Sequence, residues 1–411
     1  MNPVDFTEKL YDADAYATFF DATLLSVTAE SEKDSRPVYR LLLDRTLFFP
    51  EEGGQSPDCG ILTQYKDGME LSFDVFDVQL QKNLIYHTVS PSAQNPSAVP
   101  DPNFPVHGQI DWKHRFSNMQ QHSGEHIFSG IVHRLYGFEN VGFHLSNQTV
   151  TMDYNGVLST EQVAEVELLV NRAISENVEI TAGYPSKEEL SALDYRSKKE
   201  IDGAIRIVTV SGYDICACCA PHVKRTGEIG LLKVMQVQNY KGGVRLTILC
   251  GFRALAAFSE KQATLSALTR LLSTSEEALA DSVKKMKNTI SQLKYDLSNA
   301  RRAHLLEKAA VLPKEERNVL FFEPALEPAT AREVVTELSR THDGFCGIFH
   351  GEESNYNYII TGTGCDCTLL ATQLRKAFGA KGGGSAQMIQ GHVDAPKEAI
   401  IKLIQEQDTA H

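Results

Sequence analysis

The chain has 411 residues, of which 42% are apolar, and its formal net charge is −13. This length exceeds that of one ordinary domain, so we expect about two to four domains. Because the sequence holds neither an apolar run of about eighteen residues nor a basic, apolar leader, we expect no membrane span, no secretory signal and a cytoplasmic location. The acidic balance argues against non-specific nucleic-acid binding, which depends on neutralising phosphates. Eight scattered cysteines indicate reduced thiols or metal ligands more than a disulfide framework.

Residues 1–108 are predicted to form a small β-barrel. Short runs of alternating polarity, such as residues 38–43, are typical of strands, and glycine and proline punctuate them. Five prolines within residues 90–105 indicate a long loop or linker before the next segment.

The segment 117–137 is predicted to be one amphipathic helix. Ser117 is suited to cap its start, apolar residues recur at helical spacing, and Gly137 is suited to end it. His122 and His126 then stand one turn apart on one face, where both imidazoles can reach one ion. An isolated pair of this kind is more often packed or solvated than metal-bound, so a metal site needs further ligands.

A second short motif, Cys-Cys-Ala-Pro-His at residues 218–222, follows the β-branched run 205–210, and we place it in the connection that leaves this strand. Together with the helical histidine pair, Cys218 and His222 supply one thiolate and three imidazoles, a set that suits Zn²⁺. Magnesium or calcium would prefer oxygen ligands. Because Cys216 and Cys219 form a Cys-x-x-Cys pattern close by, the choice among three thiols stays open.

Residues 109–253 alternate helical and strand patterns and are predicted to form an α+β domain around the metal. Residues 254–311 are predicted to be helical, with apolar residues at the a and d spacing of a coiled coil. Since the pattern spans fewer than three heptads, it fits a helical hairpin as well as a homodimer seam. The basic residues within 284–308 suit either a solvated helix face or a nucleic-acid surface. The apolar positions are Leu279, Val283, Met286, Ile290, Leu293 and Leu297.

Residues 312–411 are predicted to form an independent α/β unit. Within it, Gly382, Gly383 and Gly384 would admit close approach of a backbone to phosphate or sugar, or would form a tight structural turn. The predicted fold class is therefore multidomain α+β: an N-terminal β-barrel, a zinc-binding α+β domain, a helical coiled-coil linker and a C-terminal α/β domain.

The His-x-x-x-His and Cys-x-x-x-His pairs resemble the zinc site of the alanyl-tRNA editing proteins of the AlaX family and of the editing domain of alanyl-tRNA synthetase. Residues 43–55 (Leu-Asp-Arg-Thr-Leu-Phe-Phe-Pro-Glu-Glu-Gly-Gly-Gln), 108–115 and 226–230 agree in order with further family motifs. Residues 382–391 resemble the DHH-associated domain of the long AlaX proteins. The chain departs from the family where Cys219, Ala220 and Pro221 replace Gly-Gly-Thr, and proline fixes φ and removes a donor there.

This resemblance implies a zinc-dependent deacylase that acts in trans on mischarged tRNA(Ala), chiefly Ser-tRNA(Ala), with Gly-tRNA(Ala) as a second candidate. Thr46 and Gln55 would face the editing pocket, with Thr46 bonding the seryl hydroxyl that alanine lacks. Glu125 has three candidate roles: proton acceptor, partner of a metal ligand, or solvated helix residue. The glycines 382–384 would contact tRNA.

Two other functions stay open. In a metalloprotease, His122-x-x-Glu125-His126 would be an inverted zinc motif with Glu125 as general base, but Cys218 and His222 would then lack a role. A noncatalytic tRNA-binding protein with structural zinc would retain tRNA without deacylating it. A homodimer through the helical segment or the C-terminal domain is a further expectation.

Overall fold

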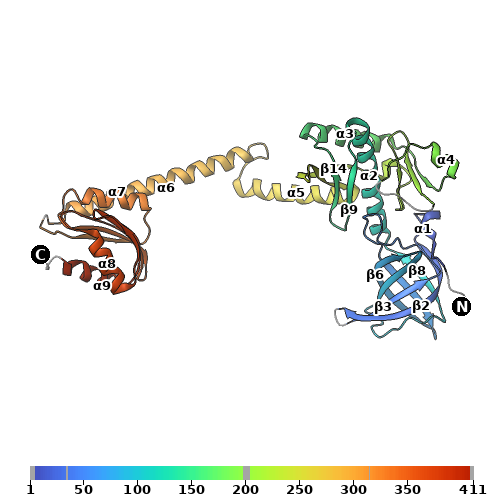
Figure 1. Ribbon diagram of the computed structural model, residues 1–411, viewed down its shortest axis with the longest axis horizontal. Coiled ribbons are helices and arrows are strands. Elements are labelled where there is room, and N and C mark those ends of the chain that lie inside the picture. The colour runs from blue at the N-terminus through green and yellow to red at the C-terminus, as the bar shows by residue number, and fades with distance from the viewer. Residues whose placement is uncertain (1–4, 34–35, 198–203, 314, 408–411) are drawn as a thin grey trace. The chain divides into compact units, whose positions relative to one another are not determined.

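The computed structural model describes residues 5–33, 36–197, 204–313 and 315–407. The chain forms two compact units, Met1–Thr264 and Leu265–His411 (Figure 1). Both units combine helices with sheets, so the predicted multidomain α+β class is confirmed.

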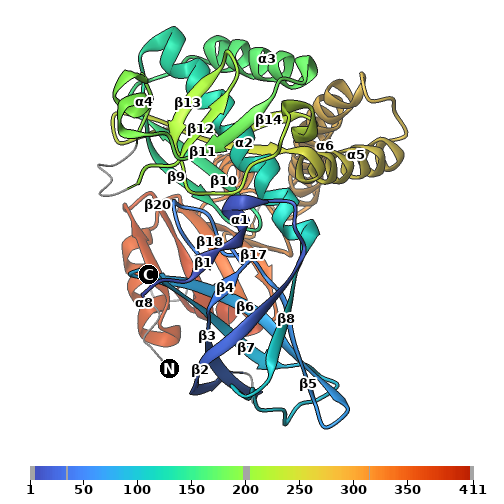
Figure 2. The ribbon, with the colours of Figure 1, turned by 90° about the vertical axis from the view of Figure 1, so that its right-hand side faces the viewer.

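Six strands of the first unit close into a barrel in the order β2-β3-β7-β6-β5-β8 (Figure 2), which confirms the predicted N-terminal β-barrel. Alternate residues such as Leu41 and Leu43 point into the barrel core, because successive side chains of a strand face opposite sides. Beside the barrel, β1 (Glu8–Lys9) pairs in parallel with β4 (Arg45–Thr46), and α1 (Leu10–Ala13) follows β1. The barrel strands are β2 (Phe19–Lys33), β3 (Arg36–Leu43), β5 (Gly60–Lys66), β6 (Met69–Gln81), β7 (Leu84–Pro91) and β8 (Pro105–Ile110).

Two antiparallel sheets complete the first unit, with strand orders β14-β15-β10-β9 and β11-β12-β13. The strand predicted at 205–210 is β12, which begins at Ile207 and forms a hairpin with β13. The strands are β9 (Asn140–Leu145), β10 (Val150–Tyr154), β11 (Ile180–Gly183), β12 (Ile207–Val210), β13 (Asp214–Ala217), β14 (Leu232–Tyr240) and β15 (Gly243–Cys250). The helical elements are α2 (Trp112–Tyr136), α3 (Thr160–Glu176), α4 (Lys187–Ala192) and the 3-10 turn η1 (Thr226–Ile229).

The helix α2 carries the histidine pair and departs from its prediction in two ways. It begins before Ser117, because the Asp111 side chain accepts a hydrogen bond from the backbone N–H of His114 and so caps the first turn. The predicted amphipathic character is also wrong: α2 is buried on every side from Asn118 to Val132, since α3, β9, β13 and β15 pack around it. Gly137 ends the helix in the left-handed conformation, as predicted.

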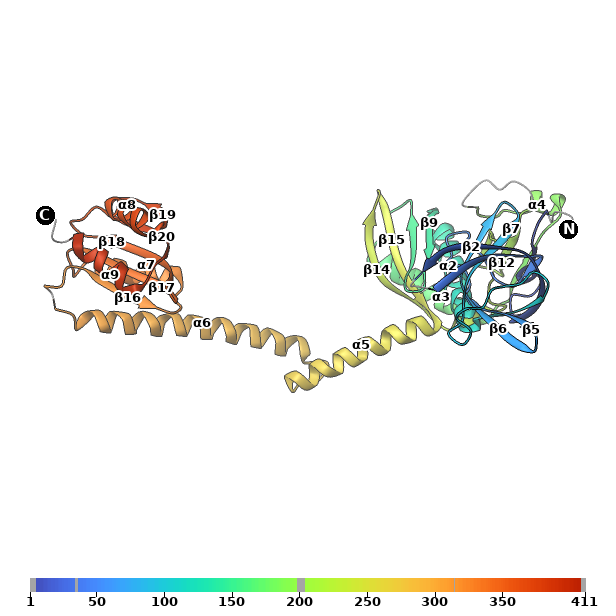
Figure 3. The ribbon, with the colours of Figure 1, turned by 90° about the horizontal axis from the view of Figure 1, so that it is seen from below.

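The second unit contains a sheet in the order β16-β17-β18-β20-β19, covered on both faces by helices (Figure 3). Phe345 and Phe349 of β17 pack with α8 and α9, whereas Cys346 and Ile348 pack with α7 and the end of α6, because neighbouring strand residues alternate in direction. The strands are β16 (Val319–Glu323), β17 (Phe345–Glu352), β18 (Asn355–Gly362), β19 (Lys381–Gly384) and β20 (Met388–Asp394). The helices are α7 (Pro328–Leu338), α8 (Cys367–Phe378) and α9 (Lys397–Glu406).

The residues predicted to be helical, 254–311, lie mostly in α5 (Gly251–Leu272) and α6 (Leu279–Ala310). Most of the apolar stripe of α6 is exposed, including Ile290 and Leu293, whereas Leu305 near the end of the helix packs against the sheet of the second unit. Within the residues that the structure describes, no helix combines the length and the apolar character needed to cross a membrane.

Candidate metal centre

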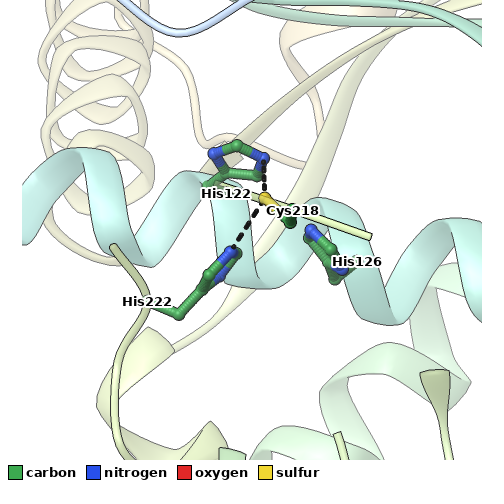
Figure 4. Close-up of side chains that lie close together, drawn as sticks. All are labelled: His122, His126, Cys218 and His222. Carbon is green, nitrogen blue, oxygen red and sulfur yellow. Dashed lines mark hydrogen bonds between the residues drawn. The ribbon is translucent and has the colours of Figure 1, made fainter. Parts of the chain in front are cut away.

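The four side chains predicted as metal ligands come together at one point. His122 and His126 project from α2, and Cys218 and His222 project from the loop after β13, so that their ligand atoms all lie within 4.8 Å of one another (Figure 4). The Cys218 sulfur lies 3.6 Å from Nε2 of His122 and 3.4 Å from Nε2 of His222. All three histidines are buried, and Cys218 is half-buried. The arrangement could hold one metal ion.

Each of the three imidazoles has a fixed partner on its other ring nitrogen, Nδ1. Such partners set the tautomer and the ring orientation of a metal-binding histidine, so each Nε2 is available as a ligand atom. The pairs are Nδ1 of His122 with Oε1 of Gln55 at 2.8 Å, Nδ1 of His126 with Oδ2 of Asp214 at 2.9 Å, and Nδ1 of His222 with Oγ of Ser123 at 3.0 Å.

Asp214 is in turn held by Arg196. The guanidinium donates from Nε to Oδ1 at 2.7 Å and from its terminal nitrogen to Oδ2 at 2.9 Å. Burial by itself would raise the pKa of Asp214, but hydrogen bonds from His126 and Arg196 lower it below its ordinary value. Sequence reasoning missed Asp214 and Arg196; the available signal was that a metal-binding histidine needs an Nδ1 partner and that Asp214 stands shortly before Cys218.

Arg206 holds the loop that carries two of the ligands. Its guanidinium donates to the carbonyl oxygens of Cys218 at 3.1 Å and Ala220 at 2.8 Å, and its Nε lies 3.5 Å from Oδ1 of Asp12. The N-terminal segment and the β12 strand region therefore fix the loop geometry together. Sequence reasoning did not identify this residue.

Electrostatics make Cys218 a thiolate candidate. Burial opposes ionisation, but His122 and His222 lower the pKa of its thiol well below the ordinary value. Burial lowers the pKa of His222 to about 3, although the neighbouring Cys218 opposes this shift. Burial also opposes protonation of His126, yet the hydrogen bond to Asp214 helps raise its pKa well above the ordinary value. Metal binding would therefore release a proton from His126.

The other two nearby thiols differ from Cys218. Burial raises the pKa of both Cys216 and Cys219, which keeps them protonated. Cys216 approaches His126 and Asp214, whereas Cys218 is the thiol that joins all three histidines. One thiolate with three buried imidazoles is a donor set that fits zinc and does not fit magnesium or calcium.

Gln55 reaches the centre from a tight turn beside the barrel. Gly53 and Gly54 have φ of 62° and 83°, and the N–H of Gln55 donates to the carbonyl of Glu52 at 3.1 Å. A Cβ on Gly54 would lie 2.3 Å from the carbonyl oxygen of Phe143, so only glycine fits there. The Oε1 atom of Gln55 lies within hydrogen-bond distance of Nδ1 of His122, a candidate metal ligand, and Nε2 of Gln55 has no hydrogen-bond partner among the described residues.

Thr46 and Glu125 are both buried, with their side chains engaged by other residues. The Thr46 hydroxyl lies 2.8 Å from Nε2 of His87 and accepts from the backbone N–H of Phe48. Oε1 of Glu125 accepts from Ser129 at 2.7 Å and from the Asn140 amide at 2.6 Å. The alternative of a solvated helix residue is therefore wrong for Glu125.

The glycines Gly382, Gly383 and Gly384 form the exposed edge strand β19 of the second unit. A Cβ at Gly382 or Gly384 would lie 2.3 Å or 2.2 Å from a carbonyl oxygen of β20. Close strand pairing therefore accounts for two of the glycines, whereas Gly383 faces open space.

Part of this site is similar to a domain found in tRNA synthetases. Residues 205–247, which include the Cys218 and His222 loop, match the family model of the threonyl and alanyl tRNA synthetase second additional domain. The chain is also 24% identical, over 98% of its length and 99% of the relative's, to the alanyl-tRNA editing protein AlaX-L of Pyrococcus horikoshii. The resemblance is thus confirmed, and the chain is a relative of the long alanyl-tRNA editing proteins.

Alanine–tRNA ligases are further relatives. The chain is 26% identical over 97% of its length to the ligase of Pyrococcus abyssi and 29% identical over 72% to that of Halobacterium salinarum, but spans only 44% and 32% of those ligases. Among solved structures, the C-Ala domain of Aquifex aeolicus alanyl-tRNA synthetase matches 21% of this chain and 86% of its own length at 21% identity. Its TM-score of 0.19 is too low to support a conclusion about the fold.

Proposed function

We propose that this protein hydrolyses the aminoacyl ester of mischarged tRNA(Ala) in trans, chiefly Ser-tRNA(Ala), with Gly-tRNA(Ala) as a second substrate. The similarity to AlaX-L supports alanyl-tRNA editing in general. The observation that carries the proposal is the contact between Gln55 and His122, because it joins the Gly-Gly-Gln turn to a buried cluster of metal ligands. A metalloprotease that used the helical histidines would leave Cys218 and His222 without a role.

The metal that we propose is zinc, held by His122, His126, Cys218 and His222. Zinc bound there would supply a Lewis acid that polarises the ester carbonyl or acidifies a water molecule. The protein's own contribution is to orient each imidazole through its Nδ1 partner and to hold the ligand loop through Arg206.

Gln55 is the residue that we assign to the ester carbonyl. Because its Oε1 is engaged by His122, its amide orientation is fixed and its Nε2 is left as an unpaired buried donor within the described part of the chain. A donor placed in this way can stabilise the negative charge that develops on the carbonyl oxygen during ester hydrolysis.

Glu125 is proposed as the proton acceptor, and Glu125→Gln tests this role. The variant keeps an oxygen to accept from Ser129 and Asn140 but removes the basic carboxylate. Loss of ester hydrolysis with retained fold and metal content would support the role, whereas full activity would refute it.

The Thr46 hydroxyl is proposed to form a hydrogen bond with the seryl hydroxyl, either as donor or as acceptor. A pocket built for a hydroxyl rejects alanine, because alanine would leave a buried polar group without a partner. Contact with a substrate requires a local shift of the segment around Thr46, since this side chain is buried and already paired with His87.

The test is release of labelled serine from Ser-tRNA(Ala), with Ala-tRNA(Ala) as the control ester and bound zinc measured in each sample. We expect serine release by the wild type and loss of both activity and zinc in the variant His122→Ala/His126→Ala. His133→Ala is the matched control, because His133 lies on the same helix but pairs at the surface with Glu139. A zinc-loaded wild type that leaves Ser-tRNA(Ala) intact would refute the proposal for this substrate.

A tRNA partner is part of the proposal, with the edge strand β19 and the basic residues of α6 as candidate contacts. Close pairing with β20 already explains why Gly382 and Gly384 are glycines. The proposed tRNA contact therefore depends on Gly383 and on the exposure of β19. Because the apolar stripe of α6 is exposed, we also propose that two copies of the chain pair along this helix as a homodimer.

A further inference from the structure

A second group of possible metal ligands, Asp214, Cys216 and His126, lies beside the predicted metal centre. One carboxylate oxygen, one sulfur and one imidazole nitrogen of these residues all lie within 4.8 Å of one another. All three residues are buried, with exposed fractions of 6%, 2% and 2%. Carboxylate, thiolate and imidazole are all donors that zinc accepts. This second group therefore has the chemistry and the spacing of a zinc site with three protein ligands.

The contact between His126 and Asp214 sets where an ion fits in the second group. Nδ1 of His126 lies 2.9 Å from Oδ2 of Asp214. Zinc bonds of about 2.0 to 2.2 Å hold two such ligands about 3.4 Å apart in tetrahedral geometry, so this contact has to open by about half an ångström. Arg196 keeps the carboxylate in place, since its Nε donates to the other oxygen, Oδ1, at 2.7 Å. An ion here would take the place of the proton that the imidazole and the carboxylate share.

The second group shares His126 with the four-ligand centre of His122, His126, Cys218 and His222, so the two cannot both be complete. A neutral imidazole has one nitrogen with a free lone pair, while its other nitrogen carries a proton. An ion bound by Nδ1 of His126 in the second group therefore leaves this residue without a ligand atom for the four-ligand centre. The protein can hold one ion in either of two neighbouring positions.

A cavity borders the second group. It has a volume of about 520 Å³ and is lined by Asp214, by Gly130, one helical turn after His126, and by exposed residues such as Asp194. Among the described residues that line this cavity, none is a ligand of the four-ligand centre. That centre consists of three buried histidines and one half-buried cysteine. An ion in the cavity therefore meets Asp214 before it meets any of the four ligands.

We propose that Asp214, Cys216 and His126 form a loading position for zinc, through which the ion passes between the cavity and the four-ligand centre. This inference rests on the proposed zinc centre and not on the proposed hydrolysis. The thiol proton of Cys216 goes to solvent when the ion binds and returns when the ion moves on. His126 carries its proton on Nε2 while the ion is in the loading position, and on Nδ1, toward Asp214, once the ion lies in the centre.

The first test measures the rates of zinc exchange in Cys216→Ser. Because Cys216 is not a ligand of the filled centre, the Kd for zinc should stay unchanged. Since Kd is the ratio of the release rate to the uptake rate, both rates should fall by the same factor. Stopped-flow uptake by the metal-free protein and transfer of zinc to a chelator measure them. Cys219→Ser is the matched control, because Cys219 adjoins Cys218 in the chain but lies outside the second group. Unchanged rates in Cys216→Ser, or a changed Kd, would overturn the loading position.

The second test asks whether the second group binds an ion by itself, with Co²⁺ as the probe because it takes the same kinds of ligand as zinc. The variant Cys218→Ser/His222→Ala removes two ligands of the four-ligand centre and leaves the second group intact. We expect this variant to bind one equivalent of Co²⁺ with a sulfur-to-cobalt charge-transfer band. Adding Cys216→Ser should abolish the band, whereas adding Cys219→Ser should keep it.

The outcomes separate the loading position from the other proposals. A wild type that binds Co²⁺ beside a Cys218→Ser/His222→Ala variant that shows no sulfur band would overturn the loading position alone. A wild type that binds neither zinc nor Co²⁺ would overturn the zinc centre and the loading position with it. Serine release enters neither test, so a failure of the proposed hydrolysis would be a separate result.

Discussion

Asp214→Asn is expected to weaken metal binding without touching a ligand of the four-ligand centre. Asp214 is buried, and its carboxylate accepts from Nδ1 of His126 and twice from Arg196. Asparagine keeps one acceptor oxygen and turns an NH2 group toward donors. The imidazole of His126 therefore loses its fixed orientation, and Arg196 keeps a buried charge without a counter-ion.

The magnitude follows from these contacts. Removal of a residue that orients a metal-binding histidine lowers metal affinity by about 10- to 100-fold, or about 1.4 to 2.7 kcal/mol. Because the pair with Arg196 is buried, removing one partner should also lower the free energy of unfolding by about 3 to 5 kcal/mol. Competition for zinc against a chromogenic chelator measures the first effect, and urea unfolding of the metal-free protein measures the second.

Asp153→Asn is the matched control. Asp153 forms a similar two-pronged pair with Arg245, at 2.6 and 2.7 Å, but contacts no histidine of the metal centre. Since this pair is partly exposed, its loss should cost about 1 kcal/mol or less of stability and leave zinc affinity unchanged. Wild-type zinc affinity in Asp214→Asn, or an equal loss in both variants, would refute the orienting role of Asp214.

Four further results are expected. Gln55→Ala should lower kcat for serine release by about 100-fold, as for an oxyanion donor, and a change in KM alone would contradict that role. Arg115→Met should lower the free energy of unfolding by about 3 to 5 kcal/mol in denaturant titrations, because it leaves the buried carboxylate of Asp58 without its ion-pair partner. A loss below about 1 kcal/mol would refute this prediction. Burial lowers the pKa of His87 from 6.5 to about 4, so between these pH values the unfolded chain binds more protons than the folded chain. The free energy of unfolding should therefore fall by about 3 kcal/mol as the pH is lowered from 6.5 to 4. His87→Asn should flatten this dependence when unfolding is measured against pH, and an unchanged slope would contradict the prediction. Gly383→Glu, at a position open to solvent, should weaken tRNA binding in filter assays and leave deacylation of saturating substrate intact, whereas unchanged affinity would remove β19 from the tRNA surface.

Much of the site could be predicted from local patterns. Two histidines four residues apart must share one helix face, and a Cys-x-x-x-His segment on a short loop can supply two ligands to one ion. These rules depend on spacing within a few residues, so they hold whatever the rest of the fold does. The barrel and the α/β character of the second unit likewise follow from polarity patterns along single elements.

Local patterns failed where distant segments decide the outcome. The sequence predicted Ser117 as the cap of α2, whereas in the structure the carboxylate of Asp111 forms the cap. The same helix is buried on all sides, because sheets and a helix from several parts of the sequence enclose it. The glycines of β19 suggested phosphate contact, yet two of them are explained by close approach to β20.

By itself, the sequence determined the identity and spacing of the candidate metal ligands, because helix and loop geometry constrain residues that are close in the chain. Only the tertiary structure decided what surrounds them. The ring partners of the histidines and the contacts of Arg206 with the ligand loop join segments that lie far apart in the sequence. Such contacts depend on how the barrel, α2 and the β12–β13 hairpin pack together, and no spacing rule along one chain contains that information.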